Sequence, residues 1–420
     1  MGYKIMTDID IDIDIDIDTE RIRRDFTILE SGIIYMDTAA TSLTPEPVLD
    51  AVLDYYRRYN ANVGRGVHRL TRIATAEYEE ARNKVAKFIG ARAHEIVFTR
   101  NTTEGINMVA SGLSMHKGDK VVISLLEHHS NLLPWLRAKR KFGIDIEVVK
   151  PANGDRKSCE LGISDFEAAI DSDTRIVAVS HVSNALGSIL PIRAISKLCH
   201  ANDALLLVDG AQSVPHLPVD VKELGCDFMA FSGHKMLAPT GIGALYIREE
   251  LMPGIEPLNV GGGGVETASF VEYELKGANE GFESGTPDIS GAIGLGASVD
   301  YLNAIGMENV KLKEEKLTKE LIEGLQEIPG VELYGYDYDA SSNKRIGTVS
   351  FNLDGKNPDD VALLLDNKAG IIVRSGHHCC MPLMNYLGIE GTVRASLYLY
   401  NTEREVNRLL ELVRKIANGR

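Results

Sequence analysis

The sequence predicts an α/β fold in which a large domain, built on a mostly parallel sheet, is joined to a smaller α+β domain in the C-terminal part. Two observations predict this fold. Short apolar runs recur through the middle of the chain, each too short for a helix and separated from the next by polar or helix-patterned sequence. The chain also has 420 residues, 44% hydrophobic and 25% charged, an ordinary globular composition that allows two domains.

The N-terminal end is set apart by its composition. Residues 8–18 alternate Asp and Ile without a break. Strict alternation is nominally the pattern of a strand, but the segment has low complexity and its six aspartates repel one another. We predict that residues 1–20 form an acidic extension that is disordered rather than an ordered strand.

The elements of the large domain are predicted from about residue 75 onward. The segment 76–89 places apolar side chains on one face of a helix, and Gly90 is a natural helix end. Five apolar runs are predicted as strands buried on both faces, at 121–126, 175–180, 204–208, 228–231 and 243–247. We place the large domain at 41–290.

The smaller domain combines the segment after the extension, 21–40, with residues 291–420. Its strands are expected at 347–353, 370–376 and 392–397. The last helix starts at a capping box formed by Thr402 and Glu405, and its buried stripe comprises Val406, Leu409, Leu410, Val413 and Ile416. A ligand site is expected at the carboxyl ends of the sheet strands, near the junction of the two domains.

Charge and composition exclude several classes of function. A net charge of −15 argues against non-specific nucleic-acid binding, which needs clustered Lys and Arg. No apolar run approaches the length of a membrane span, and the N-terminus lacks the order of a secretory signal, so we predict a cytoplasmic protein. The five cysteines are an odd number and show no CxxC spacing, so neither a disulfide framework nor a metal site is expected.

Three features at predicted element ends form one chemical set. Asp209 closes the run ALLLV, the string SGHK (232–235) follows the run ending at Phe231, and Thr102 and Thr103 open a helix. Separately these are a turn, a solvated lysine and helix caps. Together and in this order they fit pyridoxal phosphate, whose aldehyde joins a lysine, whose ring nitrogen needs an acid partner and whose phosphate needs an anchor.

Eight short sequence motifs resemble those of a known enzyme family. The chain resembles the fold-type I, class V aminotransferase family and, within it, the cysteine desulfurases of the Suf type (group II). RSGHHC followed by RASL is typical of the desulfurase branch. The matching strings are NTTEGIN (101–107), EHHSN (127–131), HVSNALG (181–187), VDGAQ (208–212), SGHK (232–235), FESGTP (282–287), RSGHHC (374–379) and VRASLYLYN (393–401).

The resemblance implies roles for the residues that would bind the cofactor. Lys235 resembles the Schiff-base lysine, Asp209 the partner of the ring nitrogen, and His128 the histidine that stacks on the ring and helps to move protons. Thr286 would reach the phosphate of the partner subunit, which implies a homodimer. The remaining implied contacts are with the ring hydroxyl, from Gln212, and with the phosphate, from Thr102, Thr103, Ser232 and His234.

The resemblance also implies the reaction. Asn184 and Arg394 would hold the substrate carboxylate, Arg374 would lie beside the catalytic loop, and Cys379 would accept the sulfur. L-cysteine would become L-alanine, with a persulfide on Cys379 that supplies a sulfur-acceptor or scaffold protein for iron–sulfur cluster or other thio-cofactor assembly. The same site is expected to accept L-selenocysteine.

Two departures and several open points accompany the resemblance. Relatives often carry a histidine at the position of Gly64, and a small residue where this chain has Cys380, which we interpret as a buried filler rather than a sulfur relay. His129 and His181 are expected to pack or form hydrogen bonds rather than catalyse. His377 and His378 either tune the cysteine or shape its loop, and the sequence leaves both possibilities open.

Two alternative functions are less favoured. Another class V enzyme, such as an aminotransferase, an epimerase or a kynureninase-like enzyme, needs no mobile thiol, so RSGHHC argues against it. A non-catalytic sulfur carrier would not need an intact set of Lys235, Asp209 and His128.

Overall fold

The structure is a computed structural model, and it describes residues 17–64, 66–152, 158–335 and 345–419. Its largest element is a seven-stranded sheet with the strand order β2-β8-β7-β6-β5-β3-β4, in which β8 alone runs antiparallel to its neighbours. The strands are β2 (Ile96–Thr99), β3 (Lys120–Ser124), β4 (Asp145–Val149), β5 (Thr174–Ser180), β6 (Leu205–Asp209), β7 (Phe228–Ser232) and β8 (Gly243–Ile247). The predicted fold class is confirmed.

Helices cover both faces of this sheet because alternate side chains of each strand point to opposite faces. On one face Val121 and Leu207 pack with the apolar side chains of α4 (Thr102–Gly112) and α5 (Leu133–Phe142). On the other face Val122 and Leu206 pack in the cluster that includes α3 (Arg69–Phe88), α7 (Ile192–Ala201) and α9 (Ile289–Ile305). Two-sided burial explains why these strands are continuous apolar runs rather than alternating ones.

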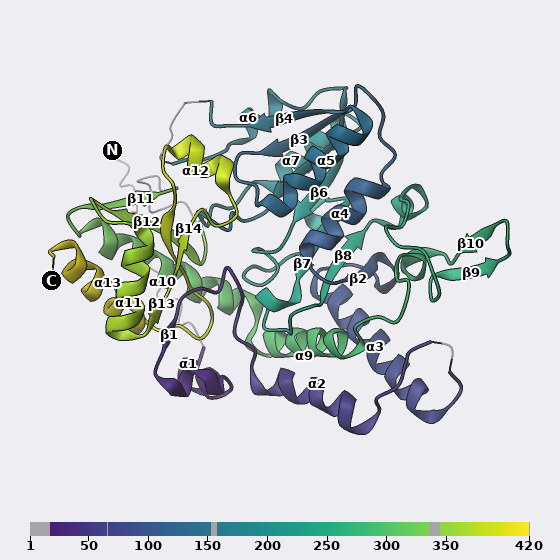
Figure 1. The fold of residues 1–420 in the computed structure, drawn as a ribbon, viewed down its shortest axis with the longest axis horizontal. Coiled ribbons are helices and arrows are strands. Elements are labelled where there is room, and N and C mark those ends of the chain that lie inside the picture. The colour runs from purple at the N-terminus through teal and green to yellow at the C-terminus, as the bar shows by residue number, and fades with distance from the viewer. Residues whose placement is uncertain (1–16, 65, 153–157, 336–344, 420) are drawn as a thin grey trace, which may run out of the picture.

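A second, antiparallel sheet lies beside the first, with the order β11-β12-β15-β14 (Figure 1). Its strands are β11 (Val331–Tyr334), β12 (Thr348–Leu353), β14 (Arg374–Gly376) and β15 (Thr392–Ser396). One face packs on α10 (Met307–Gln326), α11 (Pro358–Ala369) and α13 (Glu403–Ala417) in a separate core. The opposite face carries Ser350 and Arg394, which contact the main chain of Ala185 and Asn184 from the larger sheet region.

The N-terminal segment completes the smaller sheet region rather than the larger one. The strand β1 (Ile34–Tyr35) pairs in parallel with β13 (Ile371–Ile372), and Asp37 forms a bridge to Ser396. Next to it lie α1 (Thr19–Arg24) and η1 (Thr27–Ser31). The division of the chain into 21–40 with 291–420 and 41–290 stays a prediction.

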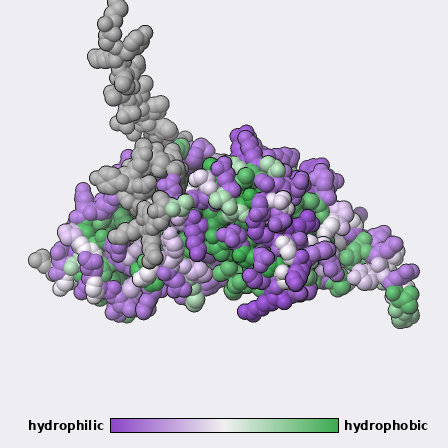
Figure 2. Space-filling view, turned by 90° about the horizontal axis from the view of Figure 1, so that it is seen from above, coloured by the Kyte–Doolittle hydropathy of each residue, from purple (hydrophilic) through white to green (hydrophobic). Residues whose placement is uncertain are grey.

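The remaining elements are short or peripheral. The helix α2 (Glu46–Arg58) packs on α9, and a hairpin of β9 (Val265–Ala268) and β10 (Tyr273–Leu275) projects from the body of the molecule (Figure 1). Figure 2 shows apolar side chains at the end of this narrow projection, where Phe270 and Val271 are fully exposed. The others are η2 (Ala93–Glu95), η3 (His129–Asn131), α6 (Ile163–Glu167), α8 (Val221–Leu224), η4 (Gly233–Lys235), η5 (Glu249–Gly254), η6 (Ala278–Phe282) and α12 (Met381–Leu387).

Four details of the sequence prediction need correction. Residues 19 and 20 belong to α1 rather than to a disordered extension, because Asp18 caps that helix and Ile22 packs in the core. The helix expected at 76–89 begins at Arg69, after the side chain of His68 accepts a hydrogen bond from the Thr71 N–H. The strand expected at 370–376 is two strands, β13 and β14. Leu410 is half-buried.

The structure also bears on the expected helix cap, the acidic extension, membrane spans and metal ligands. The capping box of Thr402 and Glu405 is confirmed. The part of the predicted acidic extension at 1–16 lies outside the described residues. In the portions of the chain that the structure covers, no helix has the length and apolar character needed to cross a bilayer. No group of three potential metal-ligating side chains occurs in those portions either.

Candidate active site

A cavity of about 190 Å³ opens where the parallel strands end. Ser180 ends β5, Asp209 ends β6 and Ser232 ends β7, and all three line the cavity. The carboxyl ends of parallel strands meet at one edge of a sheet, so residues far apart in sequence converge there. The smaller sheet region closes the cavity with the loop after β14 and with β15.

Nearly all of the residues singled out from the sequence line this one cavity. Thr286 is the exception. It is exposed, and the Asn62 side chain lies 3.5 Å from its hydroxyl. The predicted residues that line the cavity are Thr102, Thr103, His128, Asn184, Asp209, Gln212, Ser232, His234, Lys235, Arg374, Cys379 and Arg394.

Lys235 and Asp209 both line the cavity, and burial shifts the pKa of both side chains. Asp209 is 5% exposed, and one of its oxygens accepts the Ala211 N–H at 3.0 Å. Burial raises the pKa of Asp209. Burial also lowers the pKa of Lys235 to about 8, although Asp209 acts in the opposite direction. The amine of Lys235 is therefore much closer to its neutral, nucleophilic form than a free lysine.

A cradle of hydroxyls surrounds the N-terminus of α4. The N–H of Thr102 donates to Ser232 Oγ at 2.9 Å, and the two hydroxyls lie 2.7 Å apart. Thr103 Oγ1 lies 2.7 Å from Ser130 Oγ. These groups sit at the positive end of an 11-residue helix dipole, an arrangement suited to a phosphate.

The histidines and the glutamine of the cavity are uncharged groups held in fixed orientations. His128 Nδ1 accepts the Ser130 N–H at 3.0 Å, and burial lowers its pKa to about 3. Burial lowers the pKa of His234 to about 4. Gln212 Nε2 donates to the Ala39 carbonyl at 2.7 Å. His128 and His234 are thus neutral at physiological pH.

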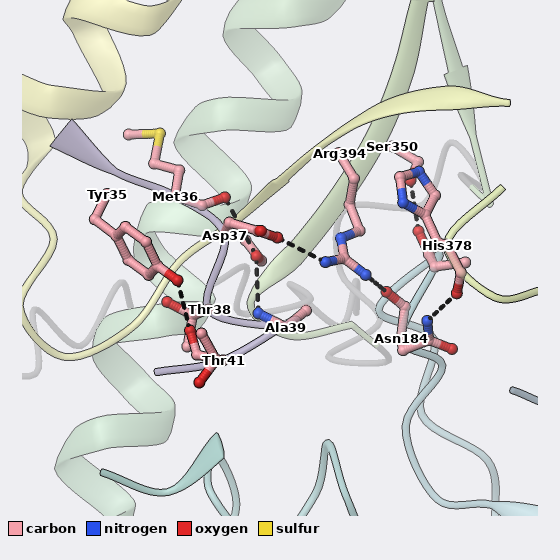
Figure 3. A network of polar contacts seen from close by, with 12 residues as sticks. Tyr35, Met36, Asp37, Thr38, Ala39, Thr41, Asn184, Ser350, His378 and Arg394 are labelled. Atoms are coloured by element: carbon pink, nitrogen blue, oxygen red, sulfur yellow. Dashed lines mark hydrogen bonds and ion pairs between the residues drawn. The ribbon is translucent and has the colours of Figure 1, made fainter. Parts of the chain in front are cut away.

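Two arginines face each other across β14 and β15. Arg374 and Arg394 are partners in the strand pairing. Arg394 is 1% exposed and donates to Asn184 O and Asp37 Oδ1, both at 2.9 Å (Figure 3). Its Nε is buried without a partner among the residues that the structure describes. Like charges placed opposite one another repel, so this corner favours an anionic ligand such as a carboxylate.

The two adjacent cysteines have different surroundings. Cys379 is half-buried and lines the cavity, and both His378 and Cys379 adopt left-handed backbone angles, with φ of 50° and 57°. Cys380 is completely buried, with its Sγ 3.2 Å from Asn184 Oδ1. Burial raises the pKa of Cys380 to about 12. Of the two thiols, Cys379 is therefore the one that faces the cavity, while the surroundings of Cys380 fit a buried filler.

Sequence reasoning missed residues that support the predicted ones. Asp37, which pairs with Arg394, comes from the other end of the chain, and no local pattern identifies it. Ser130, which contacts Thr103 and His128, lies within EHHSN, but no pattern in that string indicates these contacts. The buried Glu127 accepts hydrogen bonds from Ser180 and fixes the turn that carries His128.

Two points left open by the sequence are clearer in the structure. His378 is buried, its Nε2 lies 2.8 Å from Thr392 Oγ1, and burial with Arg394 nearby lowers its pKa to about 2. These contacts favour the loop-shaping role over tuning of the cysteine. Gly64 has a φ of 88°, in the region that favours glycine, which gives a backbone reason for glycine at this position.

Comparison with known proteins identifies the family. A sequence profile of the class-V aminotransferases matches residues 34–409. The chain belongs to the class-V aminotransferase family. Within that family it is 46% identical to a protein of Methanothermobacter thermautotrophicus named "Probable cysteine desulfurase", over 95% of this chain and 98% of the relative. A protein of Pyrococcus abyssi with the same name is also 46% identical, over 95% of this chain and 98% of that relative.

Solved structures agree with this class-V assignment. The apo structure of a cysteine desulfurase from Thermococcus onnurineus superposes with a TM-score of 0.91 at 46% identity, covering 99% of this chain and 100% of that one. The cysteine desulfurase CsdA of Escherichia coli, described in an S-sulfonic acid form, has a TM-score of 0.86 at 33% identity, covering 96% and 98%.

Pyridoxal phosphate is the cofactor of class-V aminotransferases, and the cavity fits it. The amine of Lys235 is available for the aldehyde, and the buried carboxylate of Asp209 needs a cationic partner such as a protonated ring nitrogen. The hydroxyls at the start of α4 supply an anion site for the phosphate.

Proposed function

We propose that this enzyme is a cysteine desulfurase that converts L-cysteine to L-alanine and retains the sulfur as a persulfide on Cys379. The observation that carries the proposal is the meeting of three features in one cavity: the Lys235 and Asp209 pair, the two facing arginines, and the thiol of Cys379. The identity of 46% to proteins named as probable cysteine desulfurases supports it over most of the chain.

We propose that Lys235, Asp209, Gln212, His128 and the hydroxyl cradle hold pyridoxal phosphate. The cradle consists of Thr102, Thr103 and Ser232, with His234 beside it. When bound, the cofactor supplies an electron sink for negative charge at the substrate Cα. Lys235 acts as the base that takes the Cα proton, which its lowered pKa favours.

The substrate is oriented by its carboxylate. We propose that Arg394 and Arg374 bind this group, because they form the cationic corner of the cavity. We propose a more indirect part for Asn184, because its side-chain amide already contacts the His378 carbonyl at 2.8 Å and Cys380 Sγ. Asn184 instead supports Arg394 through its main-chain oxygen.

The sulfur step is carried by Cys379. Its thiolate attacks the substrate sulfur, an S–S bond forms, and the substrate C–S bond breaks. The carbon fragment takes up a proton and leaves as alanine, so one thiol and one cysteine become one persulfide and one alanine. The persulfide then remains on the half-buried Cys379 until its outer sulfur is transferred to an acceptor.

The proposal also covers the desulfurase subgroup, a second substrate, the delivery of sulfur and the location of the enzyme. The string RSGHHC supports membership of group II, and with it use of L-selenocysteine and delivery to an acceptor protein for iron–sulfur or other thio-cofactor assembly. A nucleophilic thiol needs a reducing environment, which supports a cytoplasmic location.

A homodimer is supported by the exposed position of Thr286 and by exposed apolar side chains on α2, namely Leu49, Leu53 and Tyr56.

One experiment tests the main proposal. The purified holoenzyme is incubated with L-cysteine and a thiol reductant, and alanine and sulfide are quantified together. Equal amounts of both products are expected. Pyruvate and ammonia in place of alanine would indicate a lyase, mercaptopyruvate would indicate an aminotransferase, and absence of turnover would indicate a sulfur carrier.

A further inference from the structure

His129 contacts the main chain of the cysteine loop twice, at the Cys379 carbonyl and two residues further on. Its N–H donates to the Cys379 carbonyl at 2.8 Å, and its ring Nε2 accepts the Met381 N–H at 3.2 Å. His129 lies in η3, beside the large sheet, whereas the loop precedes α12 in the smaller sheet region. One residue therefore joins the two regions at the nucleophile.

We propose that His129 is a positioning residue that fixes the Cys379 thiol for attack by clasping the loop backbone at residues 379 and 381. The inference rests on the proposed function, since it assigns Cys379 as the nucleophile. It is distinct from the role of His128, which lies beside the cofactor site.

The conformation of the loop explains why such a clasp is needed. His378 and Cys379 are consecutive non-glycine residues in the left-handed region, an unfavourable conformation that persists only where surrounding contacts enforce it. The Asn184 amide holds the His378 carbonyl at 2.8 Å, so the backbone before Cys379 is fixed. The two bonds from His129 fix the backbone at and after Cys379, and together these contacts determine where the thiol points.

The clasp requires a neutral His129 ring. Nε2 can accept the Met381 N–H only when it carries no proton, so the ring proton belongs on Nδ1. The His377 ring lies 5.8 Å away across the loop, and the His128 ring lies 6.3 Å away. Burial and His377 lower the pKa of His129, which keeps the acceptor nitrogen free at neutral pH.

Three variants of the holoenzyme separate this role from a general effect of losing a histidine. His129→Leu removes the acceptor, whereas His129→Gln offers a side-chain oxygen in place of Nε2. His116→Leu makes the same change at an exposed position that does not line the cavity. We expect His129→Leu to lower kcat for L-cysteine by roughly 10- to 100-fold with little change in KM, because thiol placement affects the chemical step. His129→Gln is expected to recover most of that loss.

A second measurement does not depend on turnover. Hydrogen exchange of a peptide containing Met381 should accelerate in His129→Leu and remain slow in His129→Gln and His116→Leu, with unchanged melting temperatures. Normal kcat and normal exchange in His129→Leu would overturn the proposal, and so would equal losses in the Leu and Gln variants. If no variant and no wild-type sample forms alanine, the desulfurase assignment fails, while the exchange data still decide whether His129 holds the loop.

Discussion

At the scale of single residues, the chemistry of Lys235 is changed by its burial in the cavity. Its pKa falls to about 8 because the cavity removes it from solvent, while the nearby Asp209 carboxylate keeps the shift from being larger. A lysine in this state can both join an aldehyde and exchange a proton near neutral pH.

Replacement of Lys235 tests this assignment. Lys235→Ala should reduce alanine formation by at least about 10²- to 10⁴-fold, since the base for the Cα proton is lost. Borohydride treatment of the wild type should add the mass of the cofactor to the protein, and the variant should show no such addition. The exposed Lys222→Ala serves as the control. Near-normal alanine production by Lys235→Ala would contradict the role given to Lys235.

The two adjacent thiols give a second prediction at this scale. Cys379→Ser should bind the cofactor normally but lose alanine formation from cysteine, because a hydroxyl is a far weaker nucleophile than a thiolate. Cys380→Ser should keep most of the activity, since a hydroxyl can still donate to Asn184. Mass spectrometry after cysteine treatment should locate the added sulfur on Cys379. A persulfide found only on Cys380, with Cys380→Ser inactive, would show that the nucleophile is the second thiol.

At the scale of elements, α1 is the first helix of the part of the chain that the structure describes. Asp18 caps this helix, and Ile22 packs in the core. Arg23 donates to the Tyr400 carbonyl at 2.6 Å and pairs with Glu405 at 2.8 Å. The helix thereby ties the start of the chain to the first turn of α13.

Two deletions follow from these contacts. Removal of residues 1–16 should leave activity and melting temperature almost unchanged, because the Asp and Ile repeat offers no varied side chains for packing. Removal of residues 1–24 should lower the melting temperature by several degrees, since it deletes the buried Ile22 and the contacts of Arg23. Thermal denaturation of both proteins distinguishes these cases, and a large loss from the shorter deletion would show that the repeat contributes to the fold.

Elements differed in how well the sequence predicted them. The runs that became β3, β5, β6, β7 and β8 were identified because burial on both faces makes such strands uniformly apolar. The strand β4 was missed because Asp145 and Glu147 interrupt its apolar character. The left-handed backbone at His378 and Cys379 could not be predicted, since non-glycine residues adopt that region only rarely and tertiary contacts hold it here.

At the scale of the whole molecule, some residues of the site could be predicted from the sequence and others could not. The residues at strand ends, such as Asp209, Lys235 and Ser232, could be predicted because the topology of a parallel sheet brings its carboxyl ends together. Asp37 reaches Arg394, and Ala39 lines the cavity, because β1 pairs with β13. That pairing joins distant parts of the chain, and no local pattern indicates it.

The protonation of the folded molecule gives a pH prediction. Burial lowers the pKa of His181 to about 4, from an ordinary value of 6.5. Between these values the unfolded chain binds a proton that the folded chain does not, so stability falls as the pH decreases through this window. The contribution of His181 to the pH dependence of the free energy of unfolding should approach about 1 kcal/mol per pH unit.

Urea denaturation at several pH values checks this expectation. The wild type should lose stability between about pH 6.5 and pH 4. His181→Phe should show a shallower dependence, because its ring does not titrate. An identical slope in the two proteins would mean that His181 does not supply this coupling.

The bond between Asp37 and Arg394 has a consequence for biosynthesis. Its two partners are separated by 357 residues, so a ribosome that adds roughly 5–20 residues per second needs about 20–70 s to proceed from the first to the second. The strands of the large sheet are synthesised during that interval, whereas Arg374 and Arg394, the two cations of the corner, are added only near its end. A nascent chain can therefore complete the strands that carry the hydroxyl cradle long before it contains either arginine, and a chain terminated before Arg374 lacks the whole corner that we propose binds the substrate.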